Sequence, residues 1–449
     1  MKRKSCVLWL LLATVLFGLA FRIQDDPMEE QLNTLFDHVV GQGMYNGAVS
    51  VKKSGKIIFR KSYGLANFEK STPFRPETQT EIASVSKQFT ATAIMMLQAE
   101  GRLTVEDDIN LYFSPRLPFD GIHIKHLLTH TSGVPDYERY FKKNWLTDDL
   151  VTNKEILDFL YREKPPLLFS PGEKYMYSNL GYVLLAEIIH KVSGQRLDVF
   201  LHGRVFAPYG MYSTGFYDRA NIFEMDSYGP GMVWDTGQCA FVRPENLKGN
   251  AYVWYLSGRY GPGRLTSNVD DLMKWDSLLY TEAVLSKESR DIMFSPHVEV
   301  TSAREKAHYG FGWKILAKDT LGREIEHGGA WPGNYTHLKR YIDDRSAYVL
   351  LNNTYTPYMA DIKQAVDDII KGRPYTLPKP LLHDFLAKNI CKEDFDGKEW
   401  IEKNTDLSSY KINTVGWKSL LKKVSASGNQ QWIDFTVEVD KMVVRIESN

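Results

Sequence analysis

The sequence predicts an α+β fold: an antiparallel sheet flanked by helices, with an inserted, mainly helical lobe and a small C-terminal appendage. Strand-like segments occupy the two ends of the region 28–371, whereas residues from about 84 to 300 show mainly helical and loop patterns. A sheet built from both ends of this region leaves the middle of the chain as a separate lobe. We therefore expect a functional site where the sheet meets the lobe.

The individual elements follow from the periodicity of apolar residues. A helix is expected over 28–40, and a hairpin is expected between 47–51 and 57–59, around Ser54-Gly55. We expect the later strands to join the same sheet. These strands and the helix that closes the sheet are, in chain order, 309–315, 323–326, 335–341, 347–351 and 359–371.

The C-terminal part of the chain is separated from the rest by a proline-rich stretch. Residues 372–380 have the composition of a linker, and residues 381–449 are expected to form a small module. Its fold stays open: 381–391 and 417–424 are helix-like, whereas 433–439 alternates apolar and polar residues as a strand would.

The N-terminus predicts export. A basic start, Met1-Lys2-Arg3-Lys4, precedes an uncharged stretch from Cys6 to Phe21 that ends in small residues, which is the pattern of a secretory signal peptide over residues 1–20. The stretch is shorter than the roughly 20 residues that span a bilayer comfortably. We expect a periplasmic or extracellular protein, and an uncleaved N-terminal anchor is the only membrane attachment that the sequence suggests.

Charge and cysteine content limit the classes of partner. Lys+Arg and Asp+Glu both number 55, so no net charge favours nucleic acid or an anionic membrane surface. No metal-binding or phosphate-binding motif stands out, and we expect neither a metal nor a cofactor. Removal of the signal peptide would leave Cys239 and Cys391, enough for one disulfide, but the sequence does not establish that they meet.

The first motif with chemical meaning is Ser84-Val85-Ser86-Lys87. A serine and a lysine three residues apart at a helix start lie on one face, so the amine can reach the hydroxyl. The same spacing at Ser50-Lys53, Ser408-Lys411 and Ser419-Lys422 shows that the pattern alone is weak. Of the four, only Ser84-Val85-Ser86-Lys87 follows a polar lead-in and opens an apolar helix. The dipole at the start of that helix favours a neutral lysine, which can act as a base.

Two further motifs follow in the chain. In Tyr177-Ser178-Asn179 the outer side chains point the same way on an extended segment, so a phenol and an amide could face one substrate. In Glu326-His327-Gly328-Gly329-Ala330, two glycines on a strand leave room for another backbone or a ligand. Each motif also has a purely structural interpretation. Asn179 could be a turn residue, and the two glycines could mark a β-bulge.

Together, in this order, the three motifs resemble the S-x-x-K, Y-x-N and K/H-x-G set of the serine β-lactamase and penicillin-binding-protein superfamily. The nearest branch contains class C β-lactamases, D,D-peptidases and esterases. Segments 84–90, 124–133 and 270–275 also resemble signatures of this family, and the resemblance covers roughly residues 28 to 371. It implies a β-lactamase/transpeptidase-like fold for this region.

The resemblance also implies roles for individual residues. Ser84 would be the nucleophile, Lys87 its base or proton relay, and Tyr177 the group that protonates the leaving group. Backbone N–H groups of Ser84 and Ala330 would form the oxyanion hole. The residues expected to bind substrate are Asn179, His327, Gly328, Gly329 and Ala330.

Two features depart from the β-lactamase pattern. His327 stands where most β-lactamases have lysine, and a histidine with a pKa of about 6.5 would be charged only part of the time near neutrality. We therefore expect poor use of β-lactams. The run Gly261-Pro262-Gly263-Arg264 replaces small residues and is expected to add bulk and charge near the site.

The functional hypothesis is an exported serine hydrolase that forms an acyl-enzyme with an ester, a D-amino-acid peptide or a β-lactam-like amide, including a cell-wall-derived one. The alternative is a catalytically silent protein of the same fold that binds or senses cell-wall peptide or β-lactams. Intact Ser84, Lys87 and Tyr177 favour the hydrolase.

Overall fold

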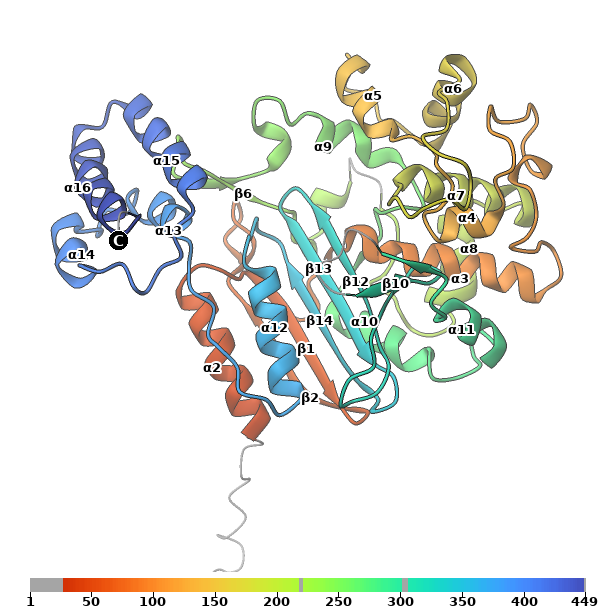
Figure 1. Ribbon diagram of the computed structural model, residues 1–449, viewed down its shortest axis with the longest axis horizontal. Coiled ribbons are helices and arrows are strands. Elements are labelled where there is room, and N and C mark those ends of the chain that lie inside the picture. The colour runs from red at the N-terminus through yellow and green to blue at the C-terminus, as the bar shows by residue number, and fades with distance from the viewer. Residues whose placement is uncertain (1–26, 218–220, 301–305, 448–449) are drawn as a thin grey trace, which may run out of the picture.

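An eight-stranded antiparallel sheet forms the centre of the molecule (Figure 1). The computed structural model describes residues 27–217, 221–300 and 306–447. The strand order is β2-β1-β14-β13-β12-β11-β10-β9. The strands are β1 (Gly47–Lys53), β2 (Lys56–Tyr63), β9 (Val298–Glu299), β10 (Ala307–Tyr309), β11 (Lys314–Leu316), β12 (Glu324–Trp331), β13 (Asn334–Tyr341) and β14 (Ser346–Asn352).

The sheet joins both ends of the region, as the sequence predicts. Strand β1 pairs with β14 so that Val49 lies opposite Leu350, and the β1–β2 hairpin turns at Ser54-Gly55. Alternate residues of these strands enter different cores. Val49 and Leu350 pack with helices α2 (Pro27–Gly41) and α12 (Met359–Ile370), whereas Ala48 and Leu351 belong to the core on the opposite face.

Helix α2 shows why this arrangement forms. Its buried side chains Leu32, Leu35, Phe36 and Val39 follow helical spacing and make one apolar stripe. That stripe packs beside α12 on the outer face of the sheet (Figure 1). The opposite face carries α3 (Ser86–Ala99), α10 (Val269–Leu278) and α11 (Lys287–Met293).

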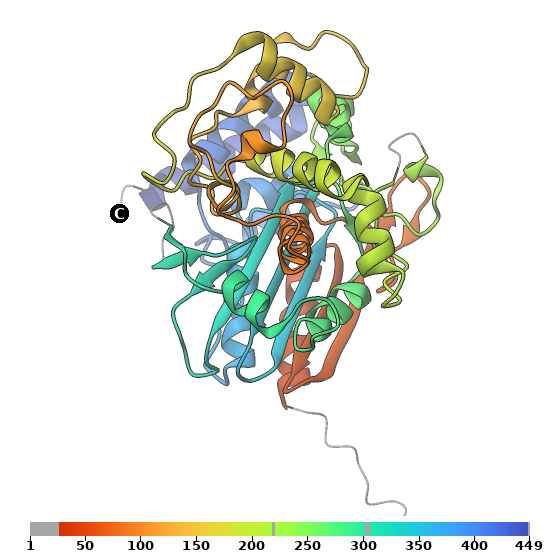
Figure 2. The ribbon, with the colours of Figure 1, turned by 90° about the vertical axis from the view of Figure 1, so that its right-hand side faces the viewer.

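The inserted lobe is mainly helical and lies beyond α3 (Figure 2). The helices of the lobe and three small two-stranded sheets lie outside the central sheet. They are α4 (Ile124–Leu128), α5 (Tyr137–Asn144), α6 (Asn153–Glu163), α7 (Asn179–Ser193), α8 (Leu197–Leu201), α9 (Tyr252–Tyr255), β3 (Leu65–Asn67) with β4 (Thr72–Pro73), β5 (Thr80–Glu81) with β8 (Thr266–Ser267), and β6 (Val233–Asp235) with β7 (Ala240–Val242).

One expected strand, 309–315, is divided into two. Strands β10 and β11 are separated by Gly310-Phe311-Gly312, and Gly312 has a φ of +77°. A Cβ on Gly312 would lie 2.8 Å from the carbonyl oxygen of Lys87. The chain therefore turns here because its backbone passes close to α3, which an unbroken strand would not allow.

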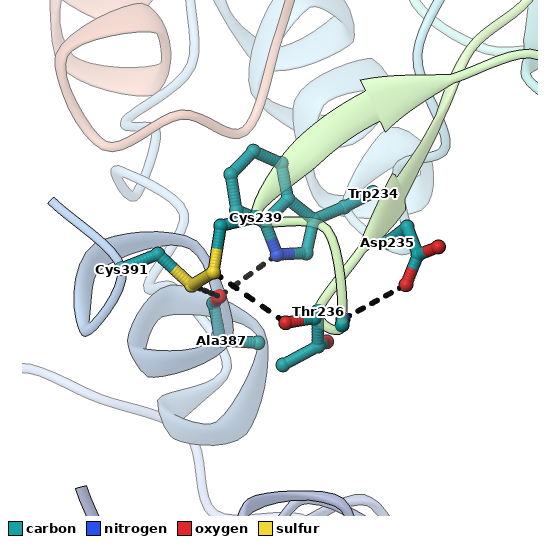
Figure 3. The surroundings of a disulfide bond; sticks show 7 residues. Trp234, Asp235, Thr236, Cys239, Ala387 and Cys391 are labelled. Atoms are coloured by element: carbon teal, nitrogen blue, oxygen red, sulfur yellow. Dashed lines mark hydrogen bonds between the residues drawn. A yellow bond between two sulfur atoms is a disulfide. The ribbon is translucent and has the colours of Figure 1, made fainter. Parts of the chain in front are cut away.

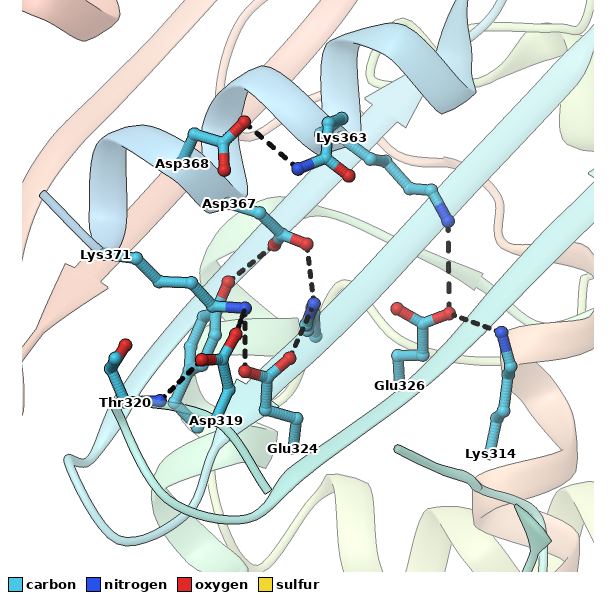
Figure 4. Close-up of polar contacts among 12 residues, drawn as sticks. Lys314, Asp319, Thr320, Glu324, Glu326, Lys363, Asp367, Asp368 and Lys371 are labelled. Carbon is cyan, nitrogen blue, oxygen red and sulfur yellow. Dashed lines mark hydrogen bonds and ion pairs between the residues drawn. The ribbon is translucent and has the colours of Figure 1, made fainter. Parts of the chain in front are cut away.

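Buried ion pairs attach α12 to the sheet (Figure 4). Lys339 of β13 lies 2.9 Å from Glu324 of β12 and 2.6 Å from Asp367 of α12. Lys371, just after α12, lies 2.7 Å from Glu324 and 2.9 Å from Asp319. Each lysine faces two carboxylates, which offsets the cost of removing its charge from water.

The C-terminal tail is helical, which settles the open question about 433–439 in favour of a helix. Its helices are α13 (Leu382–Asn389), α14 (Gly397–Lys403), α15 (Thr414–Ser427) and α16 (Gln430–Glu447), and they surround a core of their own. Cys391, after α13, forms a disulfide with Cys239 beside β7 (Figure 3). The indole of Trp234 donates a hydrogen bond to the carbonyl oxygen of Ala387 at 2.8 Å beside this disulfide.

The predicted signal peptide, residues 1–20, lies outside the described residues. Within the part of the chain that the structure describes, we find no helix with the length and apolar character needed to cross a membrane.

Candidate active site

Ser84 lies in a short 3₁₀ turn, Ala83–Val85, that leads into α3. Ala83 has a φ of +46°, which is uncommon for a residue with a side chain. The Ser86 hydroxyl holds this turn by donating to the Ala83 carbonyl oxygen at 2.6 Å. Ser84 remains partly exposed while its neighbours on both sides are buried, so its hydroxyl is the accessible group of the turn.

Lys87 is fully buried and its amine contacts three oxygen atoms. The Nζ atom lies 3.0 Å from Ser84 Oγ, 2.9 Å from Asn179 Oδ1 and 2.7 Å from the Pro262 carbonyl oxygen. An amide or carbonyl oxygen can only accept a hydrogen bond. A neutral amine would therefore donate its two hydrogens to Asn179 and Pro262 and keep its lone pair for the Ser84 hydroxyl.

The electrostatic surroundings favour that neutral amine. Burial lowers the pKa of Lys87 well below its usual value of 10.5. The nearby positive charge of Arg259 lowers this pKa further, and the carboxylate of Glu138 acts in the opposite direction. The arrangement can remove a proton from Ser84 without a histidine.

Asn179 is the first residue of α7 and is oriented by Glu138 of α5. Its Nδ2 atom donates to Glu138 Oε1 at 3.1 Å, which fixes the amide so that Oδ1 faces Lys87. Glu138 also lies 3.4 Å from the guanidinium of Arg259. Sequence reasoning missed Glu138 and Arg259, because neither belongs to a recognisable motif.

Tyr177 lies on the other side of Lys87. The lysine Nζ is 4.8 Å from the centre of its ring. Burial of the phenol raises the pKa of Tyr177, whereas a hydrogen bond with Ser84 lowers it by less. The side chain is nevertheless 40% exposed, so solvent moderates the increase. The resting phenol is protonated and can donate a proton to a leaving group.

A third residue that the motifs did not identify, His130, packs against Tyr177. The two ring centres are 4.1 Å apart, and His130 Nδ1 accepts a hydrogen bond from the backbone N–H of Ser178 at 3.1 Å. His130 has a φ of +58° and is buried. His130 lies in the segment 124–133, which resembles a family signature, but it belongs to none of the three motifs.

The structure corrects the expectation for His327. Its ring is buried and both nitrogens are engaged: Nδ1 donates to the Gly328 carbonyl oxygen at 2.7 Å, and Nε2 accepts from the Tyr309 hydroxyl at 2.8 Å. Burial lowers the pKa of His327 to about 3. The imidazole is therefore neutral near pH 7, not partly charged as its ordinary pKa suggested.

The glycines of the third motif differ in what they do. A Cβ on Gly329 would lie 2.3 Å from the Ile82 carbonyl oxygen and 3.1 Å from the Ser84 nitrogen, so only glycine lets β12 approach the serine turn this closely. A Cβ on Gly328 would make only ordinary contacts, the nearest at 3.5 Å. Gly328 and Ala330 are exposed, whereas His327 and Gly329 are buried, as a strand requires.

The run Gly261-Pro262-Gly263-Arg264 does not add free charge to the site. Arg264 forms an ion pair with Glu81, and both side chains are less than 5% exposed. Pro262 contributes its carbonyl oxygen to Lys87. The run therefore supports Lys87, which corrects the expectation that it would crowd the site with charge.

Comparison with known proteins agrees with this geometry. The family model described as "Beta-lactamase" matches residues 32–370. Penicillin-binding protein 4* of Bacillus subtilis (strain 168) is 38% identical over 353 residues, which are 78% of this chain and 78% of that protein. The D-aminopeptidase of Brucella anthropi is 26% identical over 332 residues, 73% of this chain and 59% of that protein.

A solved structure supports the same relationship. The crystal structure of a penicillin-binding protein from Bacillus halodurans matches with a TM-score of 0.64 and 25% identity, covering 76% of this chain and 98% of that one.

Proposed function

Because this chain belongs to the β-lactamase family of serine-active proteins, we propose that it is an exported serine hydrolase that forms an acyl-enzyme on Ser84. The observation that carries the proposal is the contact of Ser84 Oγ with a buried amine whose other two partners can only accept hydrogen bonds. That contact gives the serine a base.

The reaction proceeds in two steps. Lys87 takes the hydroxyl proton as Ser84 Oγ bonds to the substrate carbonyl carbon, and Tyr177 gives a proton to the departing alcohol or amine as its bond to that carbon breaks. Backbone N–H groups of Ser84 and Ala330 stabilise the oxyanion. Lys87 then passes its extra proton to the Tyr177 phenolate, which restores both groups. Water attacks the acyl carbon, one proton of the water passes through Lys87 to Ser84 Oγ as the bond from that oxygen to the acyl carbon breaks, and the acid leaves.

The substrate class that we propose is an ester or a D-amino-acid amide or peptide in preference to a β-lactam. The buried, neutral ring of His327 supports this choice, because it supplies no fixed charge for a β-lactam carboxylate. Similarity to a protein named D-aminopeptidase is consistent with it.

Export is part of the proposal and has two supports. The first is the signal-like start of the chain, and the second is the Cys239–Cys391 disulfide, since disulfides persist mainly in oxidising compartments. The substrate is therefore a small molecule or peptide outside the cytoplasm, including one derived from the cell wall.

Labelling with a fluorophosphonate, read by intact and peptide mass spectrometry, tests the nucleophile. The adduct should map to Ser84 and disappear in Ser84→Ala. A matched control is Ser408→Ala, since Ser408 also lies three residues before a lysine but is exposed in the tail. Loss of label in the control, or label retained in Ser84→Ala, would contradict the assignment.

Turnover of a p-nitrophenyl ester by the same proteins distinguishes the hydrolase from the silent binding protein. We expect release of p-nitrophenol beyond one equivalent per Ser84. A single equivalent without further turnover would favour the binding or sensing alternative.

A further inference from the structure

A cavity that Ser84 does not line lies between the helical lobe and the segment Ser257–Arg264. It has a volume of about 680 Å³, which is in the range of small-molecule sites. Helices α6, α7 and α8 supply its other walls, and the catalytic Ser84 and Lys87 do not line it.

Three polar groups of this wall have no hydrogen-bond partner. Ser257 Oγ, Arg259 Nε and Arg264 Nε are buried and unpaired among the described residues. A buried donor without a partner costs roughly 1–3 kcal/mol, so such groups call for a ligand or a local function. A guanidinium can only donate, which means that a ligand using these arginines must bring acceptor oxygens.

Lys191 is the lining cation that remains available to an anion. Five basic side chains and two carboxylates line the cavity, but four of the basic ones already pair with a carboxylate: Lys154 with Asp158, Arg196 with Asp198, Arg259 with Glu138 and Arg264 with Glu81. Both carboxylates are already engaged, Asp198 by Arg196 at 2.5 Å and Glu187 by the amide of Asn153 at 2.9 Å. Lys191, exposed on α7, makes no ion pair with any described residue.

The cavity also has an apolar, aromatic side. The rings of Phe216 and Tyr260 lie 4.9 Å apart, and the Arg196 guanidinium lies 5.2 Å from the centre of the Tyr260 ring. Leu157 and Ala186 extend this surface. A ligand that satisfies both sides carries an anionic group on a flat apolar body.

Both arginines connect this cavity to the candidate active site. Arg259 pairs with Glu138, which orients Asn179 against Lys87. Arg264 pairs with Glu81, three residues before Ser84. Between them, Pro262 contacts the Lys87 amine directly. A ligand that attracts either arginine therefore changes the surroundings of Lys87.

We propose that this cavity is a regulatory site for a small organic anion, a carboxylate or phosphate on an aromatic or similarly flat group, and that its occupation lowers the reactivity of Ser84. The binding of the anion is argued from the cavity and its lining alone, whereas the effect on Ser84 rests on the proposed hydrolase function. The sign follows from charge: an anion beside Arg259 reduces the positive potential that adds to burial in keeping Lys87 neutral.

Calorimetry on the full chain tests binding. Phenyl phosphate and benzoate represent the two anion classes, and benzyl alcohol is a neutral control with the same ring. We expect at least one anion to bind with a Kd below about 1 mM, the weak end of specific binding, and benzyl alcohol to bind at least tenfold more weakly. Stronger binding of phenyl phosphate would identify phosphate as the preferred group, and stronger binding of benzoate would identify carboxylate.

Two variants locate the bound anion. Lys191→Glu should weaken binding at least tenfold, because it places a negative charge at the mouth of the cavity. Lys287→Glu is the matched control: Lys287 is an exposed lysine on α11 that does not line the cavity, and its replacement should leave the Kd unchanged. No anion binding, or equal weakening by both variants, would overturn the site.

Ester turnover at saturating ligand tests the coupling. The rate should fall severalfold in the parent, and the concentration that halves it should rise in Lys191→Glu. Binding without any change in rate would overturn the regulatory effect while the site stands. A parent that binds the anion but has no turnover even without it would contradict the proposed function instead.

Discussion

At the residue scale, the site depends on how one buried lysine is kept neutral. Among the described residues no carboxylate contacts Lys87 directly; its amine faces a hydroxyl, an amide oxygen and a carbonyl oxygen. The charges that affect it, Arg259 and Glu138, act through space and in opposite directions. Replacing Arg259 and replacing Glu138 should therefore shift the pKa of Lys87 in opposite directions.

Glu138→Gln and Arg259→Gln should move the acid limb of kcat/KM in opposite directions. Acylation needs neutral Lys87, so activity falls as pH drops through the pKa of this lysine. Glu138→Gln removes a negative charge and should move the limb to lower pH, whereas Arg259→Gln removes a positive charge and should move it to higher pH. Each shift should be on the order of one pH unit. Limbs that move together or not at all would show that Lys87 is not the titrating base.

The buried imidazole of His327 leads to a prediction about substrate charge. With a pKa of about 3, it stays neutral from pH 5.5 to 8, whereas a histidine of ordinary pKa would change from mostly charged to mostly neutral. The ratio of kcat/KM for a carboxylate-bearing substrate to that for a neutral ester should stay constant within about twofold over this range. A ratio that rises toward pH 5.5 in the parent, and becomes flat in His327→Gln, would show that His327 reads the carboxylate.

The residues of the three motifs could be predicted because each carries its chemistry in a short stretch of chain. Lys87 reaches Ser84 because both lie within one turn. Glu138 and Arg259 could not be predicted, since each is an ordinary surface-type residue in sequence and becomes part of the site only when α5 and the segment after α9 pack beside α7.

At the scale of elements, the close approach of β12 to the serine turn sets the geometry of the oxyanion site. Residues 82–84 meet β12 at Gly329, where no Cβ fits. The neighbouring Gly328 has room for a methyl group. Alanine substitutions at these two adjacent glycines can therefore be compared within a single strand.

Gly329→Ala should lower acylation by on the order of a hundredfold, because it pushes the strand away from Ser84 and displaces an oxyanion donor. It should also lower the Tm, since its Cβ would overlap backbone atoms. Gly328→Ala should change the free energy of unfolding by no more than about 0.5 kcal/mol. Thermal unfolding and ester acylation measure both effects. Equal losses of stability in the two variants would contradict the close approach at Gly329.

The sheet could be predicted at the level of elements because its strands alternate and its helices have one apolar face. The division of 309–315 could not, because the cause is a contact between Gly312 and α3 that lies far away in the sequence. The tail segment 433–439 is ambiguous in sequence for a different reason. A short stretch of alternating apolar and polar residues fits either a strand or a helix, and the packing of α16 within the tail core makes it a helix.

At the scale of the whole molecule, a disulfide ties the C-terminal helices to the rest of the chain in addition to the linker 372–380. Cys239 and Cys391 are 152 residues apart in sequence, and their disulfide joins the β6–β7 hairpin to the end of α13. Sequence could not establish this pairing, because it depends on how the tail packs beside the β6–β7 hairpin, to one side of the sheet (Figure 1).

Cys239→Ser combined with Cys391→Ser should lower the free energy of unfolding by about 2–4 kcal/mol, the usual contribution of a disulfide. Ester turnover at 25 °C should remain, since neither cysteine contacts the site. Thermal unfolding with and without dithiothreitol is the measurement, and the double variant serves as its own control because its Tm should not respond to the reductant. A parent whose Tm is equally insensitive would show that the link is absent or contributes nothing.

The central claim is that neutral Lys87 activates Ser84, and rapid-quench mass spectrometry tests it most directly. After mixing with an activated ester, the parent should accumulate an adduct on Ser84 before product is released, and Lys87→Ala should form that adduct at least about a hundredfold more slowly with unchanged Tm. Formation of the Ser84 adduct at the parent rate in folded Lys87→Ala would contradict the account.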